Sequence, residues 1–244
     1  MDQAAYANMA EVTDKHWWFI ARRRIFTYLI RKLNLPQNAK ILEAGCASGG
    51  NLATFAQFGE MFAFEYDSGM RQLAENRGIA TVEAGMLPEE IPFPDQQFDL
   101  IALPDVLEHV ERDQATLKAL ADRLNPGGYL LITVPAFPFL WSRHDTIHHH
   151  FRRYLLPDLV HQVQAAGMTI HMSNYFNFWL FAPIALVRWL ERHRILPAST
   201  HWHTKVPHPL INRLLTEVFA SERFLLPNAK IPYGVSAIII AQKP

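Results

Sequence analysis

The sequence predicts an α/β fold in which a doubly wound, mostly parallel sheet of seven strands carries helices on both faces. From residue 40 onward, short apolar runs alternate with segments whose apolar residues recur at helical spacing. This alternation is typical of parallel sheets, because the crossover between parallel strands is usually a helix. About 60 residues rich in aromatic residues, His and Pro separate the last two runs. A connection of that length predicts a helical insertion between the last two strands.

The predicted elements follow in order along the chain. A helix is predicted over 18–33, ending before Pro36, with one apolar face made of Trp18, Arg22, Ile25, Phe26, Leu29 and Leu33. Strands are predicted over 40–44, 61–66, 79–83, 98–103, 129–134, 168–173 and 235–241. Further helices are predicted over 51–58, around Met70, Leu73 and Ala74, around the stripe Leu117, Leu120, Ala121 and Leu124, and over 156–166, 176–193 and 208–221. We expect an N-terminal helical cap (1–36), a main domain (37–175 and 230–244) and a helical insertion (176–229).

Composition narrows the possible partners. Lys+Arg and Asp+Glu both number 23, so the formal net charge is zero and nucleic acid is not an expected partner. Cys46 is the single cysteine, which excludes an internal disulfide and suits a reducing compartment. The N-terminus lacks the pattern of a secretory signal, and the longest apolar stretch, 178–187, is well below the roughly 20 residues that span a membrane. We therefore expect a cytoplasmic protein, with contact at the inner face of the membrane left open.

The segment ILEAGCASGG at 41–50 predicts a ligand-binding turn between a strand and a helix. Gly45, Ala47 and Gly49 leave space for a ligand near the backbone. Glu65, twenty residues after Gly45, stands where a carboxylate grips ribose hydroxyls. The spacing also fits a loose dinucleotide fingerprint, so a nicotinamide cofactor is an alternative at this point.

Glu43 favours a different ligand. It directly precedes the turn, and a carboxylate there repels a pyrophosphate in a poorly screened cleft. S-adenosylmethionine has no phosphate and carries an ammonium and a sulfonium, which Glu43 can favour directly or through water. The plainer alternative is that Glu43 and Glu65 are strand-end acids without a ligand.

The motif EAGCASG resembles the acidic-x-Gly-x-Gly-x-Gly motif of class I S-adenosylmethionine-dependent methyltransferases, with Ala47 in place of the middle glycine. The resemblance extends over FAFEYDSGM at 62–70, IPFPDQQFDLIALPDVLEHV at 91–110 and LNPGGYLLITVP at 124–135, in the correct order. It implies a Rossmann-like fold with an antiparallel last strand, and S-adenosylmethionine as the cofactor.

The same resemblance implies a role for each matching residue. Glu43, Gly45 and Gly49 would surround the methionine part of the donor, with Ala47 in the same loop. Glu65 would hold the ribose. The remaining matches are Tyr66 against the adenine, Gly85, Met86 and Leu87 beside the adenine edge, and Pro104 and Asp105 facing the reaction space.

Asp105, Glu108 and His109 are predicted to share one helical face after the fourth strand. Methyl transfer needs a base only when the acceptor is a weak nucleophile such as a hydroxyl. His109 and Asp105 are therefore candidate catalytic residues. The trio could also hold a divalent ion, or Glu108 and His109 could simply brace the helix. Related quinone-biosynthesis O-methyltransferases carry a similar acidic-x-x-Glu-His element.

The segment WSRHDTIHHHFRRY at 141–154 adds His150 as a third candidate base. Together with HWWFIARRR at 16–24 and the C-terminal 226–244, it resembles a bacterial subgroup of these methyltransferases with an N-terminal Trp-Trp-Phe motif. That subgroup is associated with cell-surface glycans and lipid-linked precursors. Arg152 and Arg153 could bind an anion or begin a helix. Adjacent histidines point in different directions, so we predict no metal site from the three at 148–150.

Two further features have several explanations. Arg22 lies on an apolar helix face and needs a partner once buried, which could be the carboxylate of the donor, a phosphate of the substrate or a structural ion pair. The stretch 176–194 is apolar and then basic. It could line an acceptor pocket, form a dimer interface, lie on a membrane surface or pack in the core. Its basic residues, Arg188 among them, suit an acceptor that joins an apolar portion to a phosphate or carboxylate.

These observations predict an S-adenosylmethionine-dependent methyltransferase acting at oxygen on a small-molecule, glycan or lipid-linked acceptor. One alternative is an NAD(P)-dependent oxidoreductase that uses the same loop. The other is an inactive donor-binding interaction protein. The sequence leaves the acceptor and the oligomeric state open.

Overall fold

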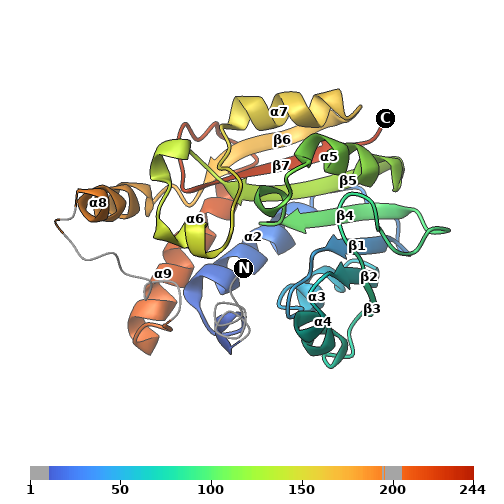
Figure 1. Cartoon of the computed structure of the whole chain (residues 1–244), viewed down its shortest axis with the longest axis horizontal. Helices are drawn as coiled ribbons and strands as arrows, with labels where there is room; N and C mark the ends of the chain where they lie inside the picture. Colours follow the sequence, from blue (N-terminus) through green and yellow to red (C-terminus); the bar gives the residue numbers. More distant parts are fainter. Residues whose placement is uncertain (1–10, 194, 196–204) are drawn as a thin grey trace.

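The computed structural model describes residues 11–193, 195 and 205–244 and shows the predicted α/β architecture (Figure 1). The sheet has seven strands in the order β3-β2-β1-β4-β5-β7-β6. Strands β1 to β5 pair in parallel, whereas β7 runs antiparallel to both β5 and β6. The prediction of a mostly parallel sheet with an antiparallel last strand is confirmed. The strands are β1 (Lys40–Ala44), β2 (Glu60–Glu65), β3 (Thr81–Ala84), β4 (Phe98–Pro104), β5 (Leu124–Pro135), β6 (Thr169–Phe176) and β7 (Ser236–Gln242).

Helices cover both faces of the sheet, as the doubly wound prediction requires (Figure 1). On one face α5 and α7 pack through Leu120 and Leu159. On the other face α2, α3 and α9 contribute Phe26, Phe55 and Phe219. The helices are α2 (Trp17–Ile30), α3 (Leu52–Phe55), α4 (Ser68–Glu75), α5 (Asp113–Asp122), α6 (Arg143–Ile147), α7 (Leu156–Ala165), α8 (Phe181–Arg192) and α9 (Pro209–Ser221), with 3₁₀ turns η1 (Leu107–His109), η2 (Pro138–Leu140) and η4 (Glu222–Phe224).

The central strands are apolar on both sides because both faces are covered. In β1, Leu42 and Ala44 belong to the core under α5 and α7, whereas Ile41 belongs to the core under α2. Successive side chains of a strand point to opposite faces, so a short run of apolar residues suits a strand buried on both sides. This explains why the short apolar run at 40–44 was a reliable strand signal.

Strand β5 differs from its prediction at the N-terminal end. It begins at Leu124 and not at Tyr129, so Leu124 belongs to the strand and not to the preceding helical stripe. The pairing with β4 shifts between Phe98–Leu124 and Leu100–Tyr129, which accommodates 125–128 as an irregular loop within the ladder. A Cβ on Gly128 would lie 3.0 Å from the Phe98 carbonyl oxygen, so glycine lets the two strands approach closely.

Three predicted helices also need correction. Helix α3 covers Leu52–Phe55, whereas the prediction was 51–58. Helix α8 begins at Phe181 and not near 176, because Phe176 still pairs with Ser236 in the sheet. In α4, Met70 and Ala74 are buried but Leu73 is 43% exposed, so the apolar stripe is narrower than expected.

Helices α2 and α9 pack side by side on one face of the sheet, although they are far apart in the sequence (Figure 1). The side chain of Asn212 in α9 accepts a hydrogen bond from Trp17 N at 2.8 Å and donates one to the Lys15 carbonyl at 2.8 Å. Phe219 packs against Trp18 with ring centroids 5.3 Å apart. Helix α2 is thereby fixed on the sheet beside α9.

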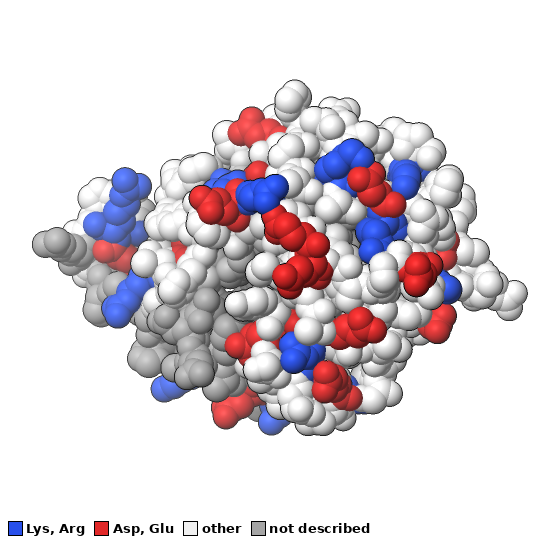
Figure 2. Space-filling model, turned by 45° about the vertical axis from the view of Figure 1, so that its right-hand side comes forward, with Lys and Arg blue, Asp and Glu red and all other residues white. Residues whose placement is uncertain are grey.

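The apolar residues of α9 are only partly buried. Phe219 is fully buried near its C-terminal end, whereas Leu210 and Leu214 are 73% and 63% exposed. Among the described residues, no helix is both long and apolar enough to cross a bilayer. On the face shown in Figure 2, Lys and Arg side chains lie among Asp and Glu side chains and do not form one continuous patch.

Candidate functional site

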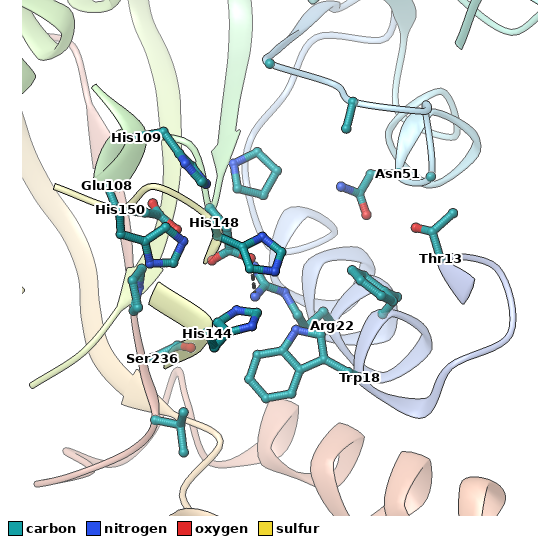
Figure 3. A pocket seen from close by; sticks show the side chains of 18 of the residues that line it. Thr13, Trp18, Arg22, Asn51, Glu108, His109, His144, His148, His150 and Ser236 are labelled. Atoms are coloured by element: carbon teal, nitrogen blue, oxygen red, sulfur yellow. Dashed lines mark ion pairs between the residues drawn. The ribbon is translucent and has the colours of Figure 1, made fainter. Parts of the chain in front are cut away.

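A cavity of about 290 Å³ lies at the carboxyl ends of β1, β4 and β5 (Figure 3). Ligands of open parallel sheets bind at this edge, where strand ends and the loops that follow them converge. Its wall combines segments that are distant in the sequence: the region 13–22, the turn after β1, η1 after β4, the region around α6, the inner side of α8 and the start of β7. The fold thus brings the turn after β1 and the predicted histidines His109 and His150 to one cavity.

The turn after β1 forms one end of this cavity. Gly45, Ala47 and Gly49 all have positive φ angles, of 72°, 46° and 77°. A Cβ on Gly45 would lie 2.9 Å from Val106 Cγ2, so this position requires glycine. Alanine is tolerated at position 47 although its backbone lies in the left-handed region that glycine favours. The backbone therefore forms an open cradle where the family resemblance expects the methionine part of the donor.

Two buried carboxylates flank the turn. Glu43 accepts a hydrogen bond from Asn51 Nδ2 at 2.8 Å, and its Oε2 has no hydrogen-bond partner in the described part of the chain. Burial raises the pKa of Glu43 to about 8. Glu65 accepts backbone hydrogen bonds from Ala47 at 2.8 Å and Asp67 at 3.0 Å, and burial raises its pKa. A cationic ligand would compensate the unpartnered oxygen of Glu43, so these residues fit S-adenosylmethionine.

Arg22 is buried beneath the cavity and pairs with Asp105. Its Nη2 donates a hydrogen bond to Thr133 Oγ1 at 2.6 Å, and Thr133 donates to Asp105 at 3.2 Å. The rings of Trp18 and Phe176 lie 5.7 and 5.5 Å from the guanidinium carbon. Of the three partners considered for Arg22, the structure shows the structural ion pair. A contact between Arg22 and the donor stays a prediction.

Asp105 does not share a helical face with Glu108 and His109, contrary to the prediction. It has a φ of 55° and precedes η1, which is a single 3₁₀ turn. This backbone turn directs Asp105 to Arg22 and leaves Glu108 and His109 to meet His150 from another loop. The predicted trio is therefore replaced by Glu108, His109 and His150.

These three residues meet at the side of the cavity opposite Thr13 and Asn51 (Figure 3). Their potential ligand atoms lie within 4.8 Å of one another. Glu108 Oε2 is buried with no partner among the described residues, and burial raises the pKa of this carboxyl. Burial and the neighbouring His150 lower the pKa of His109 to about 3, so its ring is neutral near pH 7. Such a group can hold a divalent cation or, alternatively, move a proton.

Asp145 fixes the orientation of His150. Its fully buried carboxylate accepts hydrogen bonds from Arg153 at 2.8 and 3.0 Å and from Ser142 N at 2.8 Å, and it bonds to His150 Nδ1 at 2.9 Å. Burial opposes ionisation, but the bond with His150 and the charge of Arg153 lower the pKa of Asp145. An ionised Asp145 requires a proton on His150 Nδ1. The neutral ring then carries its lone pair on Nε2.

Arg152 and Arg153 point in different directions. Arg153 is buried against Asp145 and also donates to the Ala136 carbonyl at 3.1 Å. Arg152 pairs with Asp113 at 2.6 Å, away from the cavity wall. Both guanidinium groups are engaged within the protein, so neither of them is poised for an anionic ligand.

The cavity collects part of the predicted site. Its wall includes Arg22, Glu43, Gly45, Ala47, Pro104, Asp105, His109 and His150. It does not include Gly49, Glu65, Tyr66, Gly85, Met86 and Leu87. Tyr66, for example, is 73% exposed beyond the end of β2. The roles expected for this second group remain predictions.

Several residues on or beside the cavity were not singled out from the sequence, among them Thr13, Asn51, Asp145 and Ser236. Asp145 had a detectable signal. Ser142 and Asp145 stand at the spacing of a capping box, and the structure shows that box at the start of α6. The other residues carry no local pattern, because only the tertiary fold brings them to the cavity.

A Rossmann-like sheet with a small-residue turn and an acid at the end of β1 is the architecture of class I S-adenosylmethionine-dependent methyltransferases. A family model described as a methyltransferase domain matches residues 17–192, and the chain belongs to that family. The chain therefore contains an S-adenosylmethionine-dependent methyltransferase domain. The matched range includes the turn after β1, the group Glu108, His109 and His150, and α8.

Curated relatives agree with this class. The chain is 25% identical over 148 residues to the ubiquinone/menaquinone biosynthesis C-methyltransferase UbiE of Cupriavidus metallidurans, covering 57% of this chain and 59% of the relative. It is 27% identical over 149 residues to the demethylmenaquinone methyltransferase of Tropheryma whipplei, covering 60% and 58%. The matches thus span less than two thirds of these relatives.

Two solved structures share the fold at low identity. A TehB-like S-adenosylmethionine-dependent methyltransferase from Corynebacterium glutamicum has a TM-score of 0.59 at 15% identity, covering 99% of both chains. Phosphoethanolamine N-methyltransferase 2 of Haemonchus contortus, in complex with S-adenosylmethionine, has a TM-score of 0.60 at 17% identity, covering 97% of this chain and 60% of that one.

Proposed function

We propose that this methyltransferase methylates an oxygen of a small-molecule, glycan or lipid-linked acceptor, and that His150 is the base. One observation carries the proposal: Asp145 holds His150 Nδ1 at 2.9 Å, while His150 lines the same cavity as the turn after β1. A hydroxyl is a weak nucleophile and needs a base at the moment of transfer. When bound, S-adenosylmethionine supplies an activated methyl group and leaves as the thioether S-adenosylhomocysteine.

The residues of this chain accept the proton of the acceptor and stabilise the charge that results. His150 Nε2 accepts the proton of the acceptor hydroxyl, and Asp145 stabilises the resulting imidazolium because it is already ionised. His109 is less suited to this step, since its pKa of about 3 makes it a weak proton acceptor. Asp105 is engaged by Arg22 and Thr133. His150 is therefore favoured among the three candidate bases.

Carbon methylation is the second candidate, because two relatives are named as quinone-pathway methyltransferases, one of them a C-methyltransferase. Removing a proton from a phenolic hydroxyl also activates the ring carbon beside it. The same base would therefore serve either outcome, and the position of the acceptor would decide between them. Exposed apolar side chains on α8, such as Leu186 and Trp189, support an acceptor with a lipid portion.

The test uses S-adenosylmethionine with a ¹³C-labelled methyl group and a panel of catechols, demethylated quinols, glycosides and hydroxylated lipids. The ¹³C shift of the product distinguishes a methoxy group from a methyl group on carbon. His150→Ala should lower turnover strongly while donor affinity stays the same, and His109→Ala should lower it less. If turnover survives in His150→Ala, His150 is not the base. If chelation abolishes turnover, a cation at Glu108, His109 and His150 replaces the base.

A further inference from the structure

Helix α8 places one basic side chain, that of Arg188, in the cavity wall. Arg188 follows Ile184 by one helical turn, so both lie on the inner side of α8 and line the cavity. Phe181 anchors the start of the helix against Phe137, with ring centroids 5.8 Å apart. Trp189 faces solvent instead. The guanidinium of Arg188 thus lies in the cavity wall because the helix backbone of α8 positions it there.

Arg188 differs from the two other arginines of the cavity wall. Arg22 pairs with Asp105, and Arg153 pairs with Asp145. Arg188 donates one hydrogen bond to the Leu140 carbonyl at 2.7 Å, and no carboxylate of the described residues lies within ion-pair distance of it. Asp145 favours its charge from a distance but is already engaged by Arg153 and its other partners. Arg188 is therefore the arginine of this wall without an acidic partner.

A cation in this position is costly without an anion. Burial and the nearby charge of Arg153 lower the pKa of Arg188 to about 10, against the weaker influence of Asp145 and Glu191. The group still remains charged near pH 7. A charge removed from water needs a partner of opposite sign, and a guanidinium fork suits carboxylate and phosphate oxygens in particular.

The residues around Arg188 suit a ligand in which an anionic group is attached to an apolar part. The imidazoles of His144 and His148 line the same cavity and lie 4.0 Å apart between ring centroids. Ile147 and Ile184 add apolar surface to this wall. The buried acids, Glu43 and Glu108, come from the strand ends of β1 and β4 instead. The cavity wall thus combines acids on the sheet side with basic groups on the side of α6 and α8.

We propose that the methyl acceptor carries a carboxylate or phosphate group, and that Arg188 binds this group at the α8 side of the cavity. The inference deepens the proposed function and rests on it, since it places the acceptor in the same cavity as the methyl donor. The apolar residues beside Arg188 contact the part of the acceptor that joins the anion to the methylated oxygen.

The test is calorimetry on protein saturated with S-adenosylhomocysteine, so that the donor site is filled. The probes are phenyl phosphate, benzoate and the neutral benzamide. Phenyl phosphate or benzoate should bind, and benzamide should bind at least tenfold more weakly. Arg188→Gln should weaken the anionic probe at least tenfold, and Arg188→Lys should recover part of the affinity. The stronger of the two anionic probes identifies the acceptor group as phosphate or carboxylate.

Arg192→Gln is the matched control, because Arg192 lies one turn further along α8 and is exposed. It should bind the probes as the wild type does. Equal binding of the three probes by the wild type, or unchanged affinity in Arg188→Gln, overturns the proposal. A loss of S-adenosylhomocysteine affinity in Arg188→Gln also overturns it, because Arg188 would then hold the donor. Absence of S-adenosylhomocysteine binding in the wild type contradicts the donor site itself, which is a separate failure.

Discussion

The turn after β1 and the wall opposite it are built in different ways, although they face the same cavity. The turn is local: Glu43, Gly45, Ala47 and Asn51 lie within nine residues, and backbone conformation sets its shape. The opposite wall gathers side chains from η1, the α6 region and α8. A single buried carboxylate, Asp145, holds the centre of that wall together.

The difference shows how each part of the site acquires its function. A turn formed by the backbone needs only residues that tolerate a positive φ angle at a few positions, so one short motif can encode it. A wall of histidines and arginines needs buried charges to be paired, because an unpaired buried charge is costly. The turn can therefore be encoded by one short sequence motif, whereas the opposite wall depends on contacts between distant parts of the chain.

The largest expected effect is a loss of stability when the carboxylate of Asp145 is removed from the wall opposite the turn. Asp145→Ala leaves Arg153 buried without its partner, and breaking a buried ion pair in this way costs about 3–5 kcal/mol. The free energy of unfolding, measured by urea denaturation, should fall by this amount. The matched control is Glu217→Ala, which removes an exposed pair with Arg24 and should cost less than about 1 kcal/mol. Equal losses in both variants would show that Asp145 does not organise the wall.

A smaller effect is expected at the donor turn. Glu65→Ala removes the acceptor of the Ala47 N–H bond and the expected ribose contact. Losing hydrogen bonds to a charged group costs about 1.5–3 kcal/mol, which corresponds to a roughly ten- to hundredfold loss of donor affinity. Calorimetry with S-adenosylmethionine measures it, and Glu75→Ala on the exposed side of α4 is the control. Donor affinity that is normal in Glu65→Ala would move the donor away from this turn.

The smallest effect is a change of protonation at Glu43. Its raised pKa, about 8, means that the free protein holds this proton near pH 7. A donor cation favours the ionised carboxylate, so binding lowers the pKa and releases up to one proton. Donor affinity should then rise with pH, by at most about tenfold per unit, until it levels off near pH 8.

Calorimetry at pH 7 in buffers of different ionisation enthalpy counts the released protons. Glu43→Gln is the control, since it removes the titrating group while keeping the shape of the side chain. The difference between wild type and variant excludes protons released by the donor itself. If both release the same number, Glu43 is ionised before binding or lies away from the donor cation.

The fold could be predicted well from the sequence where periodicity decides it. The run 40–44 matches β1 to the residue because a strand buried on both faces places apolar residues such as Ile41 and Leu42 next to each other. The errors arose where a tertiary contact overrides local preference. Leu124 has the spacing of the helix before it, but pairing with Phe98 draws it into β5. Phe176 looks like the start of a helix, yet it completes β6 beside Ser236.

The residues of the candidate site also fall into those that a local motif predicts and those that only the tertiary fold brings together. Glu43, Gly45 and Ala47 line the cavity and could be found from one motif. The pairing of Arg22 with Asp105 could not be chosen over a contact with the donor, because the two residues are 83 positions apart. His150 could be named, but its partner Asp145 was passed over beside a run of histidines. Arg188 could be noted as a basic residue at the end of an apolar stretch, but its place in the cavity wall depends on where α8 lies against the sheet.

The placement of β7 has a consequence for the order in which the chain assembles. In the sheet β7 lies between β5 and β6, although it follows both in the sequence. During synthesis β6 therefore emerges without a neighbour to pair with and must wait for β7. Until then the far edge of the sheet at β5 is open, and unpaired edges invite association with other chains. The nascent protein is expected to depend on chaperones up to the moment when β7 inserts.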